Sequence, residues 1–161
     1  MDVPTAKDIM DRSEITLTEE VDIGDAMRRM LRAKLNGVPV VDGEGRLRGM
    51  LSEKDCLTAL VHQAVDGAPS ASVREYMTRS VESISPATQL LEIAHVFMHH
   101  SFRKLPVVDD DGRVVGQVSR RDVLRAIDSA KDNSFLYGTA ERRPAETGGV
   151  HSAMERARGK S

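Results

Sequence analysis

The stretch LPVVDDDGRVVGQVSRRD, residues 105–122, decides the fold. It begins with a β-prone run, Pro106 to Asp109, and passes through a turn rich in Asp and Gly into a second β-prone run, Val114 to Val118. Ser119 then stands where a helix would begin, and Asp122 follows three residues later, as in a capping box with Asp in place of Glu. The stretch predicts a β-hairpin that leads directly into a helix N-terminus, an end that favours anions.

The same layout occurs earlier in the chain. Within the segment 39–55, five residues each lie 67 positions before an identical residue of the later copy: Pro39, Gly45, Gly49, Ser52 and Asp55. The register holds without a gap from Met10 and Met77 to Ala59 and Ala126. A period of this length is too long for a solenoid unit and indicates a duplicated small domain. Because each copy alone would bury little surface, we expect the two to fold as one unit.

The remaining elements follow the same duplicated plan. In each copy we expect a helical turn, a short strand, a helix, the hairpin and a second helix. The expected bounds are 5–10, 15–17, 22–34, 38–51 and 52–65, then 73–77, 81–84, 87–100, 106–118 and 119–130. The β-α-β-β-α order predicts an α+β fold, a mixed α/β sheet with helices on one side.

These elements divide the chain into four parts. We place the first repeat at residues 1–66, a linker at 67–72, the second repeat at 73–130 and a polar tail at 131–161. Within the tail, Phe135, Leu136 and Tyr137 form the expected apolar anchor.

Composition limits the class of protein. The chain has 161 residues, a net charge of −2 and one cysteine, Cys56, which cannot form an internal disulfide. No apolar run approaches the length of a membrane span, and the first ten residues lack the basic start and apolar stretch of a signal peptide. We therefore expect a cytoplasmic protein that contacts no membrane. The mild net acidity argues against a nucleic-acid surface.

The Ser and Asp of each copy suit a sugar. A carboxylate accepts hydrogen bonds at two oxygens, so it could take both hydroxyls of a cis-diol. The amides of the first helical turn can receive phosphate oxygens, and nearby cations would hold the phosphate. The cations are Arg103, Lys104, Arg120 and Arg121 in the second copy, and Lys54 in the first.

The two copies together resemble a tandem pair of cystathionine-β-synthase (CBS) domains, often called a Bateman module. The resemblance rests on VPVVD at 38–42 and LPVVD at 105–109, and on GMLSEKD at 49–55 and GQVSRRD at 116–122. Gln117 departs from the family pattern, which has an apolar residue at that position. The resemblance covers about residues 3–130 and implies two repeats packed with pseudo-twofold symmetry.

The same resemblance implies that Ser52 with Asp55, and Ser119 with Asp122, hold the ribose of an adenosine ligand. The adenine would lie in an apolar cleft between strands of the two repeats. It would contact the backbone near Thr16 and Thr18 or near Ser83 and Ser85.

Basic residues before the Pro of the hairpin would face the phosphates of such a ligand. Arg103 and Lys104 hold these positions in the second copy, whereas Asn36 and Gly37 stand there in the first. We therefore expect two unequal sites, with Asp122 at the better one.

Some of these features have a plainer alternative. Asp55 and Asp122 could be helix caps and no more. His95 and His99 lie four residues apart on an expected helix, next to His100. No further ligand is placed to complete a metal shell, so a solvated helix face is the better interpretation of these histidines.

The sequence favours regulation over catalysis. Ser52, Ser119 and Cys56 have no His at a recognisable spacing, so no nucleophilic triad is indicated and we expect no enzyme. We expect a module that needs no cofactor and binds AMP, ADP or ATP, with S-adenosylmethionine less favoured. The resemblance implies a homodimer formed through the helical faces, and an effector protein would act in trans. The alternative is a ligand-independent oligomerisation module with vestigial clefts.

Overall fold

The computed structural model describes residues 3–13 and 15–130. The expected polar tail at 131–161, with its anchor at Phe135–Tyr137, lies outside the described residues. The first repeat contains α1 (Ala6–Ile9), β1 (Leu17–Thr18), α2 (Ile23–Ala33), β2 (Gly37–Val41), β3 (Leu47–Ser52) and α3 (Glu53–Asp66). The second contains α4 (Val73–Tyr76), α5 (Leu90–His99), β4 (Lys104–Val108), β5 (Val114–Ser119) and α6 (Arg120–Ser129).

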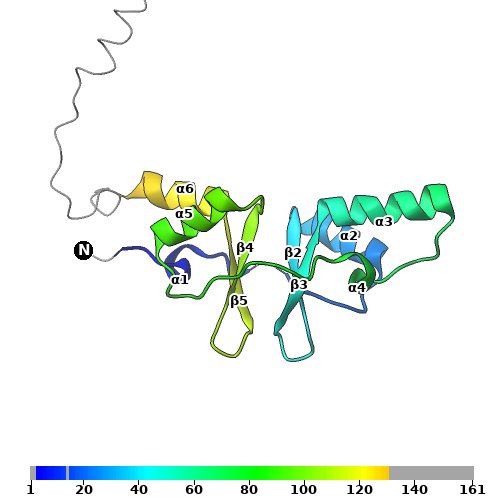
Figure 1. Cartoon of the computed structure of the whole chain (residues 1–161), viewed down its shortest axis with the longest axis horizontal. Helices are drawn as coiled ribbons and strands as arrows, with labels where there is room; N and C mark the ends of the chain where they lie inside the picture. Colours follow the sequence, from blue (N-terminus) through cyan, green and yellow to red (C-terminus); the bar gives the residue numbers. More distant parts are fainter. Residues whose placement is uncertain (1–2, 14, 131–161) are drawn as a thin grey trace, which may run out of the picture. The chain divides into compact units, whose positions relative to one another are not determined.

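Each repeat is built around a hairpin. In the first, β2 pairs antiparallel with β3 and parallel with β1, which gives the sheet order β1-β2-β3. In the second, β4 pairs antiparallel with β5. Helices pack beside each hairpin, α2 and α3 by the first and α5 and α6 by the second (Figure 1). The fold predicted from the duplicated sequence is confirmed.

The strand expected at 81–84 is reduced to one residue. Ile84 forms a single parallel bridge with Val107. The N–H of Ile84 donates to the Pro106 carbonyl at 3.0 Å, and the N–H of Val108 donates to the Ile84 carbonyl at 2.9 Å. The bridge ends because the Ser85 N–H donates to Oγ1 of Thr88 at 3.1 Å and so enters a turn. The counterpart in the first repeat, β1, forms two residue pairs with β2.

Local sequence explains the helix bounds. Asp22 is the N-cap of α2, where its Oδ1 accepts bonds from the N–H groups of Gly24 (2.8 Å) and Asp25 (3.3 Å). Along α2, Ile23, Ala26 and Met30 are buried at helical spacing. The helix ends at Lys34, which adopts the left-handed conformation with φ of 55°.

The opening turn of each repeat packs on the other repeat. The N–H of Ala6 donates to the Thr88 carbonyl at 2.8 Å, which attaches α1 to the second repeat. In the same way the N–H of Val73 donates to the Val21 carbonyl at 2.8 Å and attaches α4 to the first. Val73 is fully buried in the first repeat's core, among Leu17, Ile23, Val38 and Leu51. Because each repeat packs its opening helix on the other, the folding of each repeat depends on the other.

The two hairpins also meet at their turns. The N–H of Leu47 donates to the Gly112 carbonyl, and the N–H of Val114 donates to the Gly45 carbonyl, both at 3.0 Å. Gly45 is equivalent to Gly112 and Leu47 to Val114 by the 67-residue offset, so each bond is the equivalent of the other, as a pseudo-twofold relation requires. Both glycines have positive φ, 82° and 80°, which other residues rarely adopt. The tips of the two hairpins lie side by side in Figure 1.

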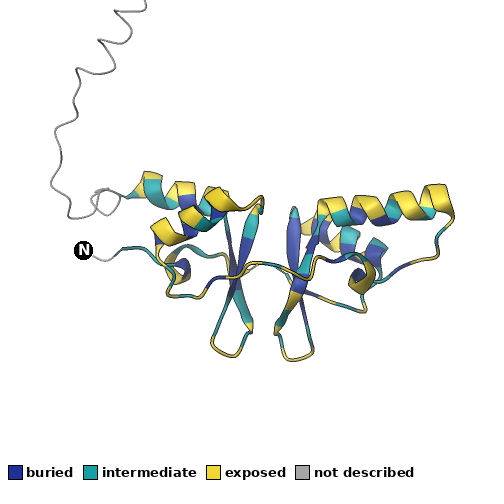
Figure 2. Ribbon diagram, in the orientation of Figure 1, coloured by how far each residue is buried: buried dark blue, intermediate teal, exposed yellow. Residues whose placement is uncertain are grey.

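Burial follows the layering. Dark blue residues lie along the strands and the inner helix faces, while the outer helix faces and hairpin tips are exposed (Figure 2). Within the described part of the chain, no helix combines the length and the apolar character that crossing a bilayer requires.

Candidate functional site

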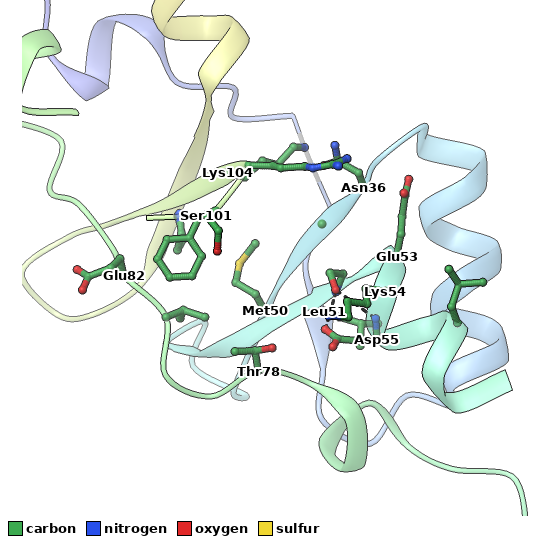
Figure 3. Close-up of a pocket in the computed structure, with 17 residues that line it drawn as sticks. Asn36, Met50, Leu51, Glu53, Lys54, Asp55, Thr78, Glu82, Ser101 and Lys104 are labelled. Carbon is green, nitrogen blue, oxygen red and sulfur yellow. Dashed lines mark hydrogen bonds between the residues drawn. The ribbon is translucent and has the colours of Figure 1, made fainter. Parts of the chain in front are cut away.

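A cavity of about 480 Å³ lies between the two repeats. Its labelled residues come from both repeats (Figure 3). The first repeat contributes Asn36, Gly37, Met50, Leu51, Ser52, Glu53, Lys54, Asp55 and Leu57. The rest of the lining is Thr78, Val81, Glu82, Ser101, Phe102, Arg103, Lys104 and Pro106. The size is that of pockets that hold small ligands.

The N-terminus of α3 presents Ser52 and Asp55 to this cavity. The N–H of Ser52 donates to Oδ2 of Asp55 at 2.9 Å, and the N–H of Asp55 donates to Oγ of Ser52 at 3.2 Å. This reciprocal capping box fixes the orientation of the carboxylate. The bond from Ser52 uses Oδ2 of Asp55, and no described residue donates to Oδ1. Oδ1 of Asp55 can therefore accept from a ligand hydroxyl.

Ser119 and Asp122 repeat the capping box at the start of α6. The N–H of Ser119 donates to Oδ2 of Asp122 at 2.8 Å, and the N–H of Asp122 donates to Oγ of Ser119 at 3.0 Å. Here the second carboxylate oxygen has a neighbour, because Nη1 of Arg125 lies 3.9 Å from Oδ1. This distance is too long for a hydrogen bond, so Oδ1 of Asp122, like that of Asp55, can accept from a ligand hydroxyl.

The structure pairs the expected cations differently from the sequence interpretation. Arg103 and Lys104 were expected to face the phosphates of a ligand at Asp122, but both line the cavity that holds Asp55. The reason is the pseudo-twofold relation, which places the residues before one hairpin opposite the helix N-terminus of the other repeat. The preference for Asp122 then rests on Arg120 and Arg121, and stays a prediction.

The other expected site residues are more scattered. Lys54 lines the cavity. Arg120 and Arg121 are exposed at the start of α6, and Arg120 borders a groove between α5 and α6. Thr16, Thr18, Ser83 and Ser85 are exposed and are not among the residues that line the cavity. The chain reaches the cavity a few residues before Ser83, at Val81 and Glu82.

Sequence reasoning missed the apolar wall of the cavity. Met50, Val81, Phe102 and Pro106 provide surfaces on which a flat ring could pack. Figure 3 shows the Met50 side chain among the labelled lining residues. Phe102 is one of only three phenylalanines in the chain and directly precedes Arg103, a signal that could have pointed to it.

Gly49 allows the segment after α4 to approach this wall. A Cβ at Gly49 would lie 2.5 Å from the carbonyl oxygen of Thr78, closer than any real side chain tolerates. Next to it, the N–H groups of Met50 and Thr78 donate to each other's carbonyls at 2.9 Å. The missing side chain therefore lets Thr78 reach the sheet edge and the cavity.

The remaining reactive groups show no catalytic arrangement in the described residues. Burial raises the pKa of the Cys56 thiol, and the nearby Asp55 charge adds to this, so the nucleophilic thiolate is disfavoured. His95 and His99 are exposed with ring centroids 4.3 Å apart. No group of three or more potential metal ligands occurs in residues 3–13 and 15–130.

The family model described as CBS domain matches the chain twice, at residues 6–62 and 73–129. The chain spans 42% and 63% of the length of two curated relatives, at 31% and 29% identity.

Solved structures resemble the chain over most of its length. A structure of CBSX2 in complex with AMP, a CBS-pair protein from Arabidopsis thaliana, has a TM-score of 0.68 and 28% identity, and the match covers 76% of this chain and 94% of that one. The cytosolic domain of the Mg²⁺ channel MgtE in complex with ATP has a TM-score of 0.66 and 31% identity over 75% and 48%. The CBS domain pair of protein MJ0100, in complex with 5′-methylthioadenosine and S-adenosylmethionine, has a TM-score of 0.65 and 28% identity over 79% and 98%.

Proposed function

The chain belongs to the CBS domain family as a tandem pair, and from that premise we propose that it is a regulatory module that binds an adenine nucleotide between its repeats. The observation that carries the proposal is the shared cavity. It combines a capped Ser-Asp pair from one repeat with Arg103 and Lys104 from the other.

Each part of a nucleotide has a counterpart in this cavity. The free oxygen of Asp55 accepts from the ribose hydroxyls, which is a charge-assisted bond. Arg103 and Lys54 offer cationic groups to phosphates, and the N-terminus of α3 adds the positive end of the helix dipole. The purine packs against Met50 and Phe102.

The cations favour AMP, ADP or ATP over S-adenosylmethionine. A phosphate gains charge-assisted bonds from Arg103, whereas a sulfonium is repelled by it. Relatives support this class of ligand, because three solved structures that resemble the chain hold AMP, ATP, and 5′-methylthioadenosine with S-adenosylmethionine, respectively. The nucleotide acts as a signal, and the module needs no other cofactor.

Regulation follows from the position of the ligand. A molecule that contacts both repeats stabilises the arrangement in which its contacts are complete, and so shifts the population of conformations. An effector protein reads this shift in trans, in the cytoplasm. The module itself catalyses no reaction.

We also propose that two copies pair through their helices. Large apolar side chains remain exposed on the outer helix faces: Leu31, Leu57, Val61 and Val65 in the first repeat, and Leu91, Met98 and Leu124 in the second. Exposed apolar surface of this kind marks an interaction site, and a self-complementary face gives a closed dimer. The dimer would carry the ligand-dependent change to the effector.

Isothermal titration calorimetry of the full chain with AMP, ADP, ATP and S-adenosylmethionine tests the proposal. We expect saturable binding of at least one adenine nucleotide, with S-adenosylmethionine weaker. Absence of binding at millimolar concentration would overturn it. If sedimentation then still finds a dimer, the alternative of a ligand-independent oligomerisation module is supported.

A further inference from the structure

Gln117 is a buried polar residue with an unused acceptor. It lies in β5, is only 3% exposed, and no donor in the described part of the chain reaches its side-chain oxygen Oε1. Both main-chain groups of Gln117 are hydrogen-bonded to Asp11. The N–H of Gln117 donates to the Asp11 carbonyl at 3.0 Å, and the N–H of Asp11 donates to the Gln117 carbonyl at 2.9 Å. A buried amide that lacks a partner destabilises a fold, so its presence calls for an explanation.

Met50 is the exact counterpart of Gln117 in the first repeat, 67 residues earlier. Each pairs across its hairpin with a proline, Met50 with Pro39 and Gln117 with Pro106. Each also exchanges two main-chain bonds with the segment after an opening helix, Met50 with Thr78 after α4 and Gln117 with Asp11 after α1. The two side chains therefore occupy equivalent places in the two repeats.

Strand alternation places the Gln117 side chain toward the other repeat. Its neighbour Val118 and the cross-strand partner Leu105 are fully buried on the opposite face of the hairpin. Pro106, which shares the face of Gln117, lines the cavity between the repeats. Met50 lines that cavity with Ser52 and Asp55, and Figure 3 labels Met50 and Asp55. By the 67-residue offset, Gln117 holds the equivalent position relative to Ser119 and Asp122.

We propose that Gln117 selects purines that carry an amino group. Its Oε1 accepts a hydrogen bond from the 6-amino group of a nucleotide whose ribose is held at Ser119 and Asp122. Where Met50 offers a ligand only apolar contact, Gln117 offers an acceptor, and this makes the second position selective. The inference rests on the proposed function, because it requires that an adenine nucleotide binds between the repeats.

The side-chain amide of Gln117 can be observed directly. The chain has three glutamines, Gln63, Gln89 and Gln117, so glutamine-selective ¹⁵N labelling gives few side-chain signals, and Gln117→Met assigns the one that disappears. AMP is compared with purine riboside 5′-monophosphate, which lacks only the 6-amino group. We expect the Gln117 signal to shift with AMP and to shift much less with the deamino analogue, and Asp122→Asn to suppress the shift.

Calorimetry supplies the second measurement. The wild-type chain should bind AMP at this position about fivefold more tightly than the deamino analogue, the ratio that one net hydrogen bond gives. Gln117→Met should make the two affinities equal, whereas Gln63→Met, the same change in α3 and outside the cavity lining, should leave the ratio unchanged.

The outcomes separate the two proposals. If AMP binds but the Gln117 signal does not move, or if both nucleotides move it equally, the role of Gln117 is overturned and the proposed function stands. If no adenine nucleotide binds the wild-type chain, both are overturned.

Discussion

Asp55 and Arg103 line one cavity although they belong to different repeats and stand 48 residues apart in the chain. The carboxylate is held by the capping box of α3, and the arginine directly precedes β4. Under the proposed function, a ligand with a ribose and a phosphate would contact both repeats at once, and its binding would be coupled to their arrangement.

Arg103→Gln should weaken AMP binding by about tenfold, because a phosphate loses a charge-assisted hydrogen bond worth about 1.5 kcal/mol. Adenosine, which has no phosphate, should bind both proteins equally. Calorimetry with the two ligands measures this difference, and Arg29→Gln on the exposed part of α2 is the control. An equal loss for adenosine would show that Arg103 supports the fold of the cavity and does not bind the phosphate.

Asp55→Asn should reduce AMP affinity by about tenfold, since the amide keeps one capping oxygen but loses the charge that strengthens the bond to the ribose. Asp122→Asn should reduce it by less than about threefold, because this change leaves the cavity of Asp55 intact. The paired variants are compared by calorimetry. A larger effect at Asp122 would reverse this order and favour the ranking expected from the sequence.

Gly49→Ala should destabilise the fold more than Gly116→Ala. The new Cβ at position 49 meets the main-chain oxygen of Thr78 at 2.5 Å, and main chain cannot move away without breaking its bonds to Met50. At position 116 the closest atom, at 2.8 Å, is Sδ of Met10 in a flexible side chain, and the nearest main-chain atom, the Asp11 oxygen, lies farther away at 3.0 Å. We expect losses of about 3 and 1 kcal/mol in the free energy of unfolding, measured by urea denaturation. Equal losses would contradict the difference.

The hairpins and capping boxes could be predicted from the sequence because their determinants are local. Turn residues, alternating apolar residues and a Ser-x-x-Asp motif lie within a few positions of the structure that they specify, and the constant offset repeats them. The early end of the strand at Ile84 was less predictable, since it depends on the hydrogen bond from the Ser85 N–H to the Thr88 hydroxyl.

The composition of the cavity could not be predicted in the same way. Arg103 precedes the hairpin of the second repeat and was grouped with the nearest motif in sequence, that of Asp122. The pseudo-twofold packing decides whether Arg103 lies near Asp55 or Asp122, because it brings the chain before one hairpin to the helix of the other repeat. Phe102 and Val81 were missed for the same reason, because neither belongs to a repeated motif.

Gln117→Met should stabilise the ligand-free protein by about 1 kcal/mol. It removes a buried acceptor without a partner among the described residues and replaces it with the residue found at the equivalent position in the first repeat. Thermal and urea unfolding without nucleotide measure the change. A destabilised variant would mean that the amide makes a contact that the fold requires.

Stability should fall in acid partly through Asp22. The hydroxyl of Ser70 donates to its Oδ2 at 2.7 Å, and this bond, with the N–H groups of Asp25 and Gly24, lowers the pKa of Asp22. A lowered pKa contributes stability that is complete above the unfolded value of about 3.9 and is lost as pH falls through the folded value. Ser70→Ala should therefore reduce the loss of unfolding free energy between pH 6 and pH 3. An unchanged pH profile would show that this bond does not set the pKa.

Leu124→Glu should convert the proposed dimer to a monomer. Leu124 is 66% exposed on α6 and borders the groove that also contains Phe97 and Met98, so a charge there opposes burial against a second copy. Because the side chain is exposed within one copy, the fold should tolerate the change. Gly43→Glu, which adds the same charge in a turn with open space around it, is the control. Sedimentation equilibrium should give a dimer for the wild-type and control proteins and a monomer for Leu124→Glu; a dimer in all three would place the contact elsewhere.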